Sequence, residues 1–259
     1  MRVAFICDDE PFHIPGTVAA VIESRPEHDF SVISVPGHGS FSKMGTNFKR
    51  YLGLYGPLGF PVRAFQFLSL KLAAALRLPT PKPHSLKQAA HRTGARFIKL
   101  ESINSKEGRQ LLRSLEPDVF FSIACPQILK TRTLSIPRLG VYNIHTSLLP
   151  ENRGMLPSFW TLFEDQGRTG VTLHRMNEQL DAGPILLQEE IPARLSDTSL
   201  HQLIARGKRT AATLLTKALD ILETDDIKLY PNDRSEATTN SFPERKDVVE
   251  FRRRGGRIW

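Results

Sequence analysis

Short apolar runs and amphipathic helical segments alternate along most of this 259-residue chain. The first apolar run, Arg2 to Cys7, is followed by a segment with helical character from Gly16 to Glu23, and Pro15 suits the N-terminus of that helix. Strands and helices in this order form parallel strands with helices packed on the sheet. The pattern therefore predicts an α/β fold with a Rossmann-like, mostly parallel sheet.

The same criteria predict the remaining elements. Strands are expected at 30–35, 97–100, 119–124, 139–144, 169–176 and 184–191. Helices are expected at 86–92, 105–115, 157–164 and 198–224, with Ser85 and Asp197 as N-caps and Gly94 as a helix stop. We expect a core over residues 1–195, and a C-terminal helix with an extended tail packed on it over residues 196–259.

A basic insert at about residues 36–92 interrupts this alternation. From Phe30 to Leu100 there is no Asp or Glu but eleven Lys and Arg, so the rest of the chain, whose total is +8, carries a net charge of −3. The cations are Lys43, Lys49, Arg50, Arg63, Lys71, Arg77, Lys82, Lys87, Arg92, Arg96 and Lys99. Apolar residues at helical spacing predict a helix over 62–78, bounded by Pro61 and Pro79.

Composition places the chain among ordinary globular proteins. Cys7 and Cys125 have no paired spacing and lie in apolar runs, which indicates reduced thiols in a cytosolic protein. No run has the length of a transmembrane helix, and the first apolar run is too short for a signal peptide. We therefore expect a cytoplasmic protein, near the inner face of the membrane.

An amide, an imidazole and a carboxylate stand out in the second half of the chain. Asn143 and His145 lie two residues apart in a predicted strand end, so their side chains leave on the same face. The carboxylate of Asp181, in an Asp-Ala-Gly-Pro turn, could orient the imidazole and hold its tautomer. The amide could donate to an oxygen on which negative charge develops. This set favours acyl transfer without a covalent enzyme intermediate.

These residues resemble the folate-dependent formyltransferase family, whose members move a formyl group from N10-formyltetrahydrofolate to an amine. Several spaced elements match the family pattern in order: Asn143, His145, Ser147 to Pro150, Arg153-Gly154, Gly170 to Thr172 and Leu180 to Gly183. Such a combination is far more specific than one short motif. The resemblance is strong from about Pro117 to Ile191 and fades on both sides.

By this resemblance Asn143, His145 and Asp181 are the catalytic residues. Asn143 and protonated His145 would stabilise the oxyanion, while Asp181 would raise the pKa of His145 and help to move the proton of the amine. Which group removes that proton first stays open. No cluster of His, Cys, Asp and Glu has the spacing of metal ligands, so no metal is expected.

The resemblance also implies a folate pocket. Its residues would be Cys125, Pro126, Gln127, Ile128 and Leu129 after a predicted strand, together with Glu178 and Leu180. Ligands of open α/β sheets bind at this edge. Ordinary strand-end packing explains each single side chain equally well, and Asp-x-Gly is also a common turn.

Three features of the sequence indicate which branch of the family, defined by its acceptor, the chain resembles. The first strand is followed by Cys7 to Phe12, which lacks the Gly-rich phosphate loop of glycinamide ribonucleotide formyltransferases. Arg153-Gly154 is shared with methionyl-tRNA formyltransferases, but only about 35 residues follow the long helix, too few for their C-terminal β-domain. The remaining branch formylates nucleotide-linked amino sugars, and by resemblance Glu10, Arg153 and Trp160 would contact that substrate.

The expected function is therefore N-formylation of a nucleoside-diphosphate-linked 4-amino-4,6-dideoxy sugar, with GDP-perosamine as the best guess, for O-antigen in bacterial lipopolysaccharide biosynthesis. We expect the insert to bind the pyrophosphate, with peripheral membrane contact as the second interpretation and nucleic acid as the third. We expect a homodimer, and we expect no nucleic-acid partner. The alternatives are a tRNA-directed methionyl formyltransferase-like enzyme, a glycinamide ribonucleotide formyltransferase and a non-catalytic binding protein.

Overall fold

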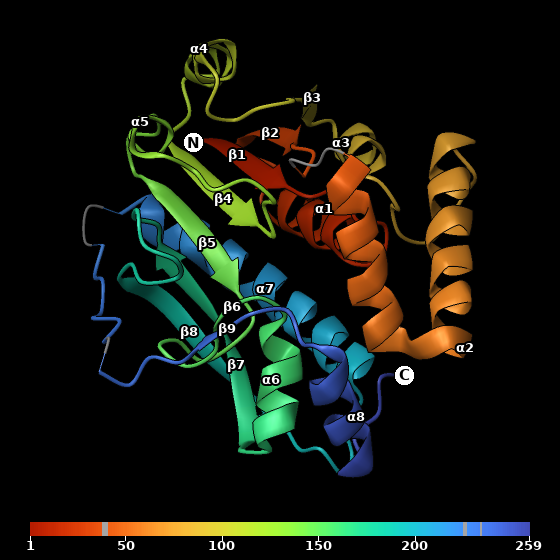
Figure 1. Ribbon diagram of the computed structural model, residues 1–259. Coiled ribbons are helices and arrows are strands. Elements are labelled where there is room, and N and C mark those ends of the chain that lie inside the picture. Colours follow the sequence, from red (N-terminus) through yellow and green to blue (C-terminus); the bar gives the residue numbers. More distant parts are fainter. Residues whose placement is uncertain (38–40, 225–226, 234) are drawn as a thin grey trace.

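The computed structural model describes residues 1–37, 41–224, 227–233 and 235–259, and residues 41–47 by their backbone alone. Within these residues seven strands form one sheet in the order β3-β2-β1-β4-β5-β7-β8 (Figure 1). Their bounds are β1 Arg2–Cys7, β2 Asp29–Ser34, β3 Arg96–Lys99, β4 Val119–Ile123, β5 Val141–His145, β7 Gly167–Arg175 and β8 Ile185–Ala193.

The first five strands of this order are parallel, and β7 and β8 continue the sheet as antiparallel strands. The chain fills one side of β1 with β2 and β3 and then crosses to β4 and β5 on the other side. Such a reversal opens a crevice at the carboxyl ends of the strands, where open α/β sheets bind ligands. The predicted Rossmann-like, mostly parallel sheet is confirmed.

Helices cover both faces of the sheet. The α-helices are α1 Ile14–Ser24, α2 Phe41–Ala75, α3 Leu86–Thr93, α4 Lys106–Ser114, α5 Thr131–Leu134, α6 Pro157–Glu164, α7 Leu200–Leu222 and α8 Arg245–Arg253. In β1 the residues Val3 and Phe5 face the cluster that includes α1, α3 and α7, whereas Ala4 and Ile6 face the cluster that includes α4. The alternation of the strand thus buries both of its faces.

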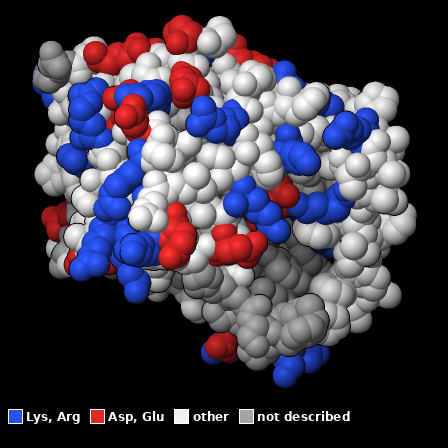
Figure 2. Space-filling model, turned by 90° about the horizontal axis from the view of Figure 1, so that it is seen from above, with Lys and Arg blue, Asp and Glu red and all other residues white. Residues whose placement is uncertain are grey.

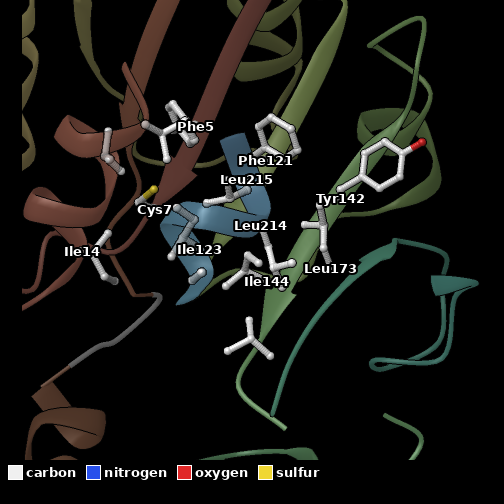
Figure 3. Close-up of a cluster of buried hydrophobic side chains, with 14 of the residues drawn as sticks. Phe5, Cys7, Ile14, Phe121, Ile123, Tyr142, Ile144, Leu173, Leu214 and Leu215 are labelled. Atoms are coloured by element: carbon white, nitrogen blue, oxygen red, sulfur yellow. The ribbon is translucent and has the colours of Figure 1, made fainter. Parts of the chain in front are cut away.

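The larger core lies between the sheet and α7 (Figure 3). The rings of Phe5 and Phe121 stack with centroids 5.8 Å apart, and Leu214 and Leu215 of α7 pack into the same cluster. Burying each such side chain is worth roughly 1.5–3 kcal/mol relative to leaving it exposed. This core fixes the C-terminal ends of β1, β4 and β5 relative to one another.

The insert differs from the sequence-based expectation. Its helix begins at Phe41 and ends at Ala75, with a break at Gly56 (φ 74°, ψ 175°), whereas a single helix over 62–78 was predicted. Pro57 directly follows the break, at the first position of the second arm, where a missing N–H donor is tolerated. Figure 1 shows α2 as two arms that meet at a corner. The side chain of Lys43 lies outside the described residues.

The C-terminal region also corrects two expectations. The N-cap of α7 is Ser199, not Asp197, because the Ser199 side chain accepts the N–H of Gln202 and completes a capping box. The tail forms α8 and the short strand β9, Thr239–Asn240, which pairs in parallel with β6, Arg153–Gly154. The helix at 86–93 has the predicted cap Ser85 and the predicted stop Gly94, and Ser105, which was expected inside the next helix, is the N-cap of the helix at 106–114.

Candidate functional site

Asn143, His145 and Asp181 meet in one pocket of about 390 Å³ at the carboxyl edge of the sheet. Asn143 and His145 project from β5 on the same face, as their spacing predicted. The Asn143 amide donates to Asp181 Oδ1 at 3.5 Å, and His145 Nδ1 lies 3.6 Å from Asp181 Oδ2. The carboxylate therefore contacts both of the other groups, one with each oxygen.

The position of Asp181 depends on its loop. Its φ is 47°, and the following Gly183 passes so close to Arg175 that an added Cβ would lie 1.7 Å from the Arg175 carbonyl oxygen. The side-chain amide of Asn232 donates to the carbonyls of Asp181 and Gly183, at 2.9 Å each. The N–H of Gly154 donates to Asp181 Oδ2 at 2.9 Å. The C-terminal tail and β6 thus hold this loop in place.

A second histidine, His174 of β7, completes the cluster. Its Nδ1 lies 3.3 Å from the Arg175 carbonyl, which can only accept, so Nδ1 carries a hydrogen. Its Nε2 lies 3.3 Å from the Asn143 amide nitrogen and 3.6 Å from Asp181 Oδ1. Nε2 thus lies within reach of both side chains, so His174 links the Asn143 amide to the Asp181 carboxylate.

Burial and neighbouring groups set the protonation states at the site. Burial lowers the pKa of His145, and the nearby charge of Asp181 opposes this shift without reversing it. Burial opposes ionisation of Asp181, but the hydrogen bond with His174, the charge of His145 and the Gly154 N–H together lower its pKa to about 2. The site therefore holds an ionised Asp181 and a neutral His145, and the expected raising effect of Asp181 on the pKa of His145 is present but smaller than the effect of burial.

The tautomer of His145 follows from its second contact. Nε2 lies 2.8 Å from the Asn152 carbonyl, so in the neutral ring Nε2 carries the hydrogen and Nδ1 has a free lone pair. That lone pair faces Asp181 Oδ2. Protonation of Nδ1 would turn this contact into a charge-assisted hydrogen bond. His145 can thus act as a base whose protonated form is stabilised where it arises.

All seven residues of the expected folate pocket line this same pocket. Gln127 is buried and structural, because its side chain accepts the N–H of Ile103 and donates to the carbonyls of Pro36 and Glu101. Ile128 and Leu180 are 79% and 60% exposed at the pocket, so they offer apolar surface to a planar ring. Glu178 accepts a hydrogen bond from Thr131. Burial raises the pKa of the Cys125 thiol to about 11.

The three expected substrate contacts do not line this pocket among the described residues. Glu10 accepts the N–H groups of Phe12, His13 and Ile14 at 2.8–2.9 Å and so caps the start of α1. Arg153 is buried and donates to Asn232 Oδ1 at 2.8 Å. The indole of Trp160 donates to the Ser241 carbonyl at 2.8 Å. The contacts of all three side chains stabilise the fold around the site.

Lys208 was not identified from the sequence, yet it lines the pocket from α7. The preceding Gly207 lies beside the residue after His145, because an added Cβ would be in van der Waals contact with Thr146 Cγ2 at 3.4 Å. Burial lowers the pKa of Lys208, and Glu10 opposes the shift. Among the described residues it is the single Lys or Arg that lines the pocket. The sequence feature that could have identified Lys208 is a glycine followed by a lysine inside an amphipathic helix.

The described residues contain neither a candidate metal site nor a candidate membrane-spanning helix. No group of three or more His, Cys, Asp and Glu side chains there is arranged to hold a metal ion. In the same residues no helix combines the length and the apolar composition needed to cross a bilayer. Cys7 and Cys125 are free thiols.

Comparison with known proteins gives consistent matches. A family model described as formyl transferase matches residues 74–219, more than half of the chain. Methionyl-tRNA formyltransferase from Thermotoga maritima is 41% identical over 171 residues, which cover 66% of this chain and 53% of that protein. The enzyme of the same name from Deinococcus radiodurans is 39% identical over 166 residues, which cover 64% and 46%. The chain spans about half the length of the curated relatives it matches.

Two solved structures superpose over most of the chain. The sugar 3-N-formyltransferase WlaRD, determined in the presence of dTDP and 5-N-formyl-THF, has a TM-score of 0.61 at 16% identity and covers 93% of this chain and 69% of that chain. Glycinamide ribonucleotide transformylase 1 from Symbiobacterium toebii has a TM-score of 0.60 at 16% identity and covers 90% and 94%. At these identities the likeness concerns the fold, which is shared by enzymes with different acceptors.

The sequence relatives overturn the expected acceptor. Proteins that are 37–41% identical are named methionyl-tRNA formyltransferase, so the expected nucleotide-linked amino sugar, with GDP-perosamine as the best guess, is wrong. The expected absence of a nucleic-acid partner is wrong for the same reason. The expectation of an amino-sugar acceptor relied on the short segment that follows α7. The sequence similarity over the core is stronger evidence than the length of that segment.

The family itself is established by independent observations. The matched residues 74–219 include β4, β5, β7 and the Asp181 loop, which form most of the pocket. The fold around them is that of formyltransferases with known structures. The chain therefore belongs to the formyl transferase family.

Proposed function

We propose that this protein transfers a formyl group from N10-formyltetrahydrofolate to the amino group of methionyl-tRNA. The observation that carries this proposal is the contact of Asn143, His145 and Asp181 within one pocket, in a core that is 37–41% identical to methionyl-tRNA formyltransferases. The three residues offer an oxyanion donor, a base and a carboxylate that stabilises the protonated base.

The donor would occupy the side of the pocket formed by Cys125 to Leu129 and by Glu178 to Leu180. Exposed Ile128 and Leu180 can cover a flat ring, and the backbone groups between Cys125 and Leu129 can hydrogen-bond its edge. Gln127 keeps this loop in position through its three buried hydrogen bonds. The formyl carbon would then lie beside Asn143 and His145.

The proposed transfer proceeds by addition and elimination. The nitrogen of the acceptor amine forms a bond to the formyl carbon, and its proton passes to Nδ1 of His145, which carries the free lone pair. Asn143 donates to the oxygen that becomes negative, a contact worth about 3 kcal/mol in comparable sites. The bond between the formyl carbon and N10 then breaks, and His145 returns the proton to N10.

Asp181 has two tasks in this scheme. It stabilises the imidazolium of His145 during transfer, because it remains ionised and lies 3.6 Å from Nδ1. It also accepts the Asn143 amide and so keeps the oxyanion donor in place. A carboxylate that performs both tasks explains why its loop is fixed by Gly154 and Asn232.

The test is an assay of the purified protein with N10-formyltetrahydrofolate and methionyl-tRNA. Formylmethionine is measured by mass spectrometry after hydrolysis of the ester bond, and glycinamide ribonucleotide is offered in a parallel reaction. We expect formylation of the methionyl group at a rate well above that with glycinamide ribonucleotide. Formylation of glycinamide ribonucleotide alone, or no dependence on His145, would contradict the proposal.

A further inference from the structure

A second cavity lies outside the matched core. It has a volume of about 770 Å³ and lies between the first arm of α2 and the segment from Ser241 to Arg252, which includes α8. Both walls fall outside residues 74–219. Figure 1 shows α8 beside the corner of α2, near the C-terminus. We call this cavity the basic groove. Its lining includes Lys49, Arg50, Gly56, Phe242, Arg245 and Arg252.

Positive charge dominates the groove. The four cations Lys49, Arg50, Arg245 and Arg252 line it and are exposed, and within the described part of the chain none of them makes an ion pair with a carboxylate. Arg252 lies over the break at Gly56 and donates to the carbonyls of Leu54 and Tyr55, which leaves its charge uncompensated.

The one acidic residue that lines the groove is already engaged. Glu244 caps α8, because its carboxylate accepts a backbone N–H of the first turn, and it makes an ion pair with Lys246 at 3.1 Å. The wider surface is different: in Figure 2, which views the face at the top of Figure 1, many Lys and Arg lie among Asp and Glu. Uncompensated cations in a groove favour an extended anion.

An aromatic ring forms part of the same wall. The guanidinium carbon of Arg50 lies 5.7 Å from the centroid of the Phe242 ring, and Tyr51 meets that ring edge-on at 5.7 Å. Phe48 and Tyr51 beside the groove are 51% and 46% exposed. Proteins that bind single-stranded nucleic acid combine a cationic groove with aromatic rings on which bases stack. The groove therefore has both elements of that recognition mode.

The groove and the catalytic pocket are linked through the β6–β9 ladder. Ser241 and Phe242 follow Asn240, which pairs with Gly154 in the β6–β9 ladder, and Gly154 donates to Asp181. Two residues of extended chain span about 7 Å, so the groove begins close to the catalytic carboxylate.

We propose that the basic groove binds the phosphodiester backbone of the single-stranded 3′ end of the acceptor RNA. This inference rests on the proposed function and extends it, because it assigns RNA binding to segments outside the matched family core. The four cations contact phosphates and the aromatic side chains stack on bases. The pocket beside it then receives the aminoacyl group.

The direct test is binding of a fluorescein-labelled single-stranded RNA that ends in CCA, measured by anisotropy as salt is varied. A groove variant carries Lys49→Ala, Arg50→Ala and Arg245→Ala. A control variant carries Lys87→Ala, Arg96→Ala and Lys106→Ala, which removes the same charge from exposed positions elsewhere. Thermal unfolding of both variants checks that the fold is intact.

For the groove variant we expect at least about a tenfold weaker Kd at moderate salt, and a slope of log K against log salt that is smaller by roughly 2, as expected for about three lost phosphate contacts on a single strand. The control variant keeps the slope of the wild type. If the groove variant binds RNA like the wild type, or if both variants lose affinity equally, the groove does not bind RNA.

Kinetics separate this inference from the proposed function. With methionyl-tRNA the groove variant should have a raised KM and an unchanged kcat, and with methionyl-adenosine, which has no phosphodiester, it should match the wild type. RNA binding without any formylation would contradict the proposed function and leave the groove supported. Formylation of methionyl-tRNA with an unchanged KM in the groove variant would refute the groove alone.

Discussion

The catalytic pocket and the basic groove are built in opposite ways. In the pocket the polar groups are buried and satisfy one another: Asp181 contacts Asn143, His145 and the Gly154 N–H. In the groove the cations are exposed, and their charges have no carboxylate partners within the described residues. The first arrangement fixes geometry for a reaction, whereas the second leaves charge available to a partner.

The comparison assigns separate tasks to separate parts of the sequence. The pocket lies mostly within the matched residues 74–219, and the groove lies outside them. Changes in the pocket should therefore affect every acceptor, and changes in the groove should affect acceptors that carry RNA. The following predictions test this division, beginning with the largest expected effect.

Replacing Asn143, His145 or Asp181 by Ala should lower kcat at least about 100-fold, because each change removes a positioned donor, base or carboxylate. The loss should be the same with methionyl-tRNA and with methionyl-adenosine, measured by formylation under saturating conditions. His145→Gln serves as the conservative variant. Near-wild-type turnover in two of the three variants would refute the assigned chemistry.

Acid should reveal the ionised carboxylate in the pocket. The pKa of Asp181 is lowered from 3.8 to about 2 in the folded protein, so its contribution to stability is present above about pH 4 and is lost as the pH falls toward 2. The lost contribution is about 2 kcal/mol. Thermal unfolding between pH 6 and 3 should show a smaller loss of Tm for Asp181→Asn than for the wild type. Parallel curves would contradict this prediction.

Asn232→Ala should disturb the pocket from the tail. The amide donates to the carbonyls of Asp181 and Gly183, and each lost hydrogen bond is worth about 1 kcal/mol. We expect kcat to fall roughly tenfold while the KM of N10-formyltetrahydrofolate barely changes. Ser235→Ala, a change at an exposed position of the same tail, is the matched control. A raised folate KM with an unchanged kcat would show that Asn232 acts on donor binding instead.

The smallest expected effect concerns Lys208. Its positive charge contributes to the lowered pKa of His145, so Lys208→Met should raise that pKa and move the acid limb of the kcat profile to higher pH, by less than about one pH unit. Lys217→Met, at an exposed position on the same helix, should leave the profile unchanged. A shift to lower pH would have the wrong sign for this account.

Much of the fold and of the pocket could be predicted from the sequence. The strand at β5 and the Asn143–His145 spacing follow from a short local pattern, and the carboxylate of Asp181 follows from the family motif. The strand depends on neighbouring residues, for which a local pattern is sufficient, whereas Asp181 was placed by the spaced elements of the family resemblance. The location of all seven expected folate-pocket residues along one pocket has the same origin.

The remaining features depend on contacts between distant segments. Asp181 raises the pKa of His145 as predicted, but burial, which no local pattern specifies, lowers that pKa by more. Lys208 lines the pocket because α7, far along the chain from β5, packs beside Thr146. The groove requires α2 to meet α8, about 200 residues later in the chain, and the helix break at Gly56 sets that meeting.

The most direct test of this division is the single-turnover rate of formyl transfer at saturating methionyl-tRNA, compared between the wild type, the groove variant and His145→Ala. The account predicts transfer at equal rates in the wild type and the groove variant, and a rate at least about 100-fold lower in His145→Ala. Equal slowing of both variants, or equal rates in His145→Ala and the wild type, would contradict it.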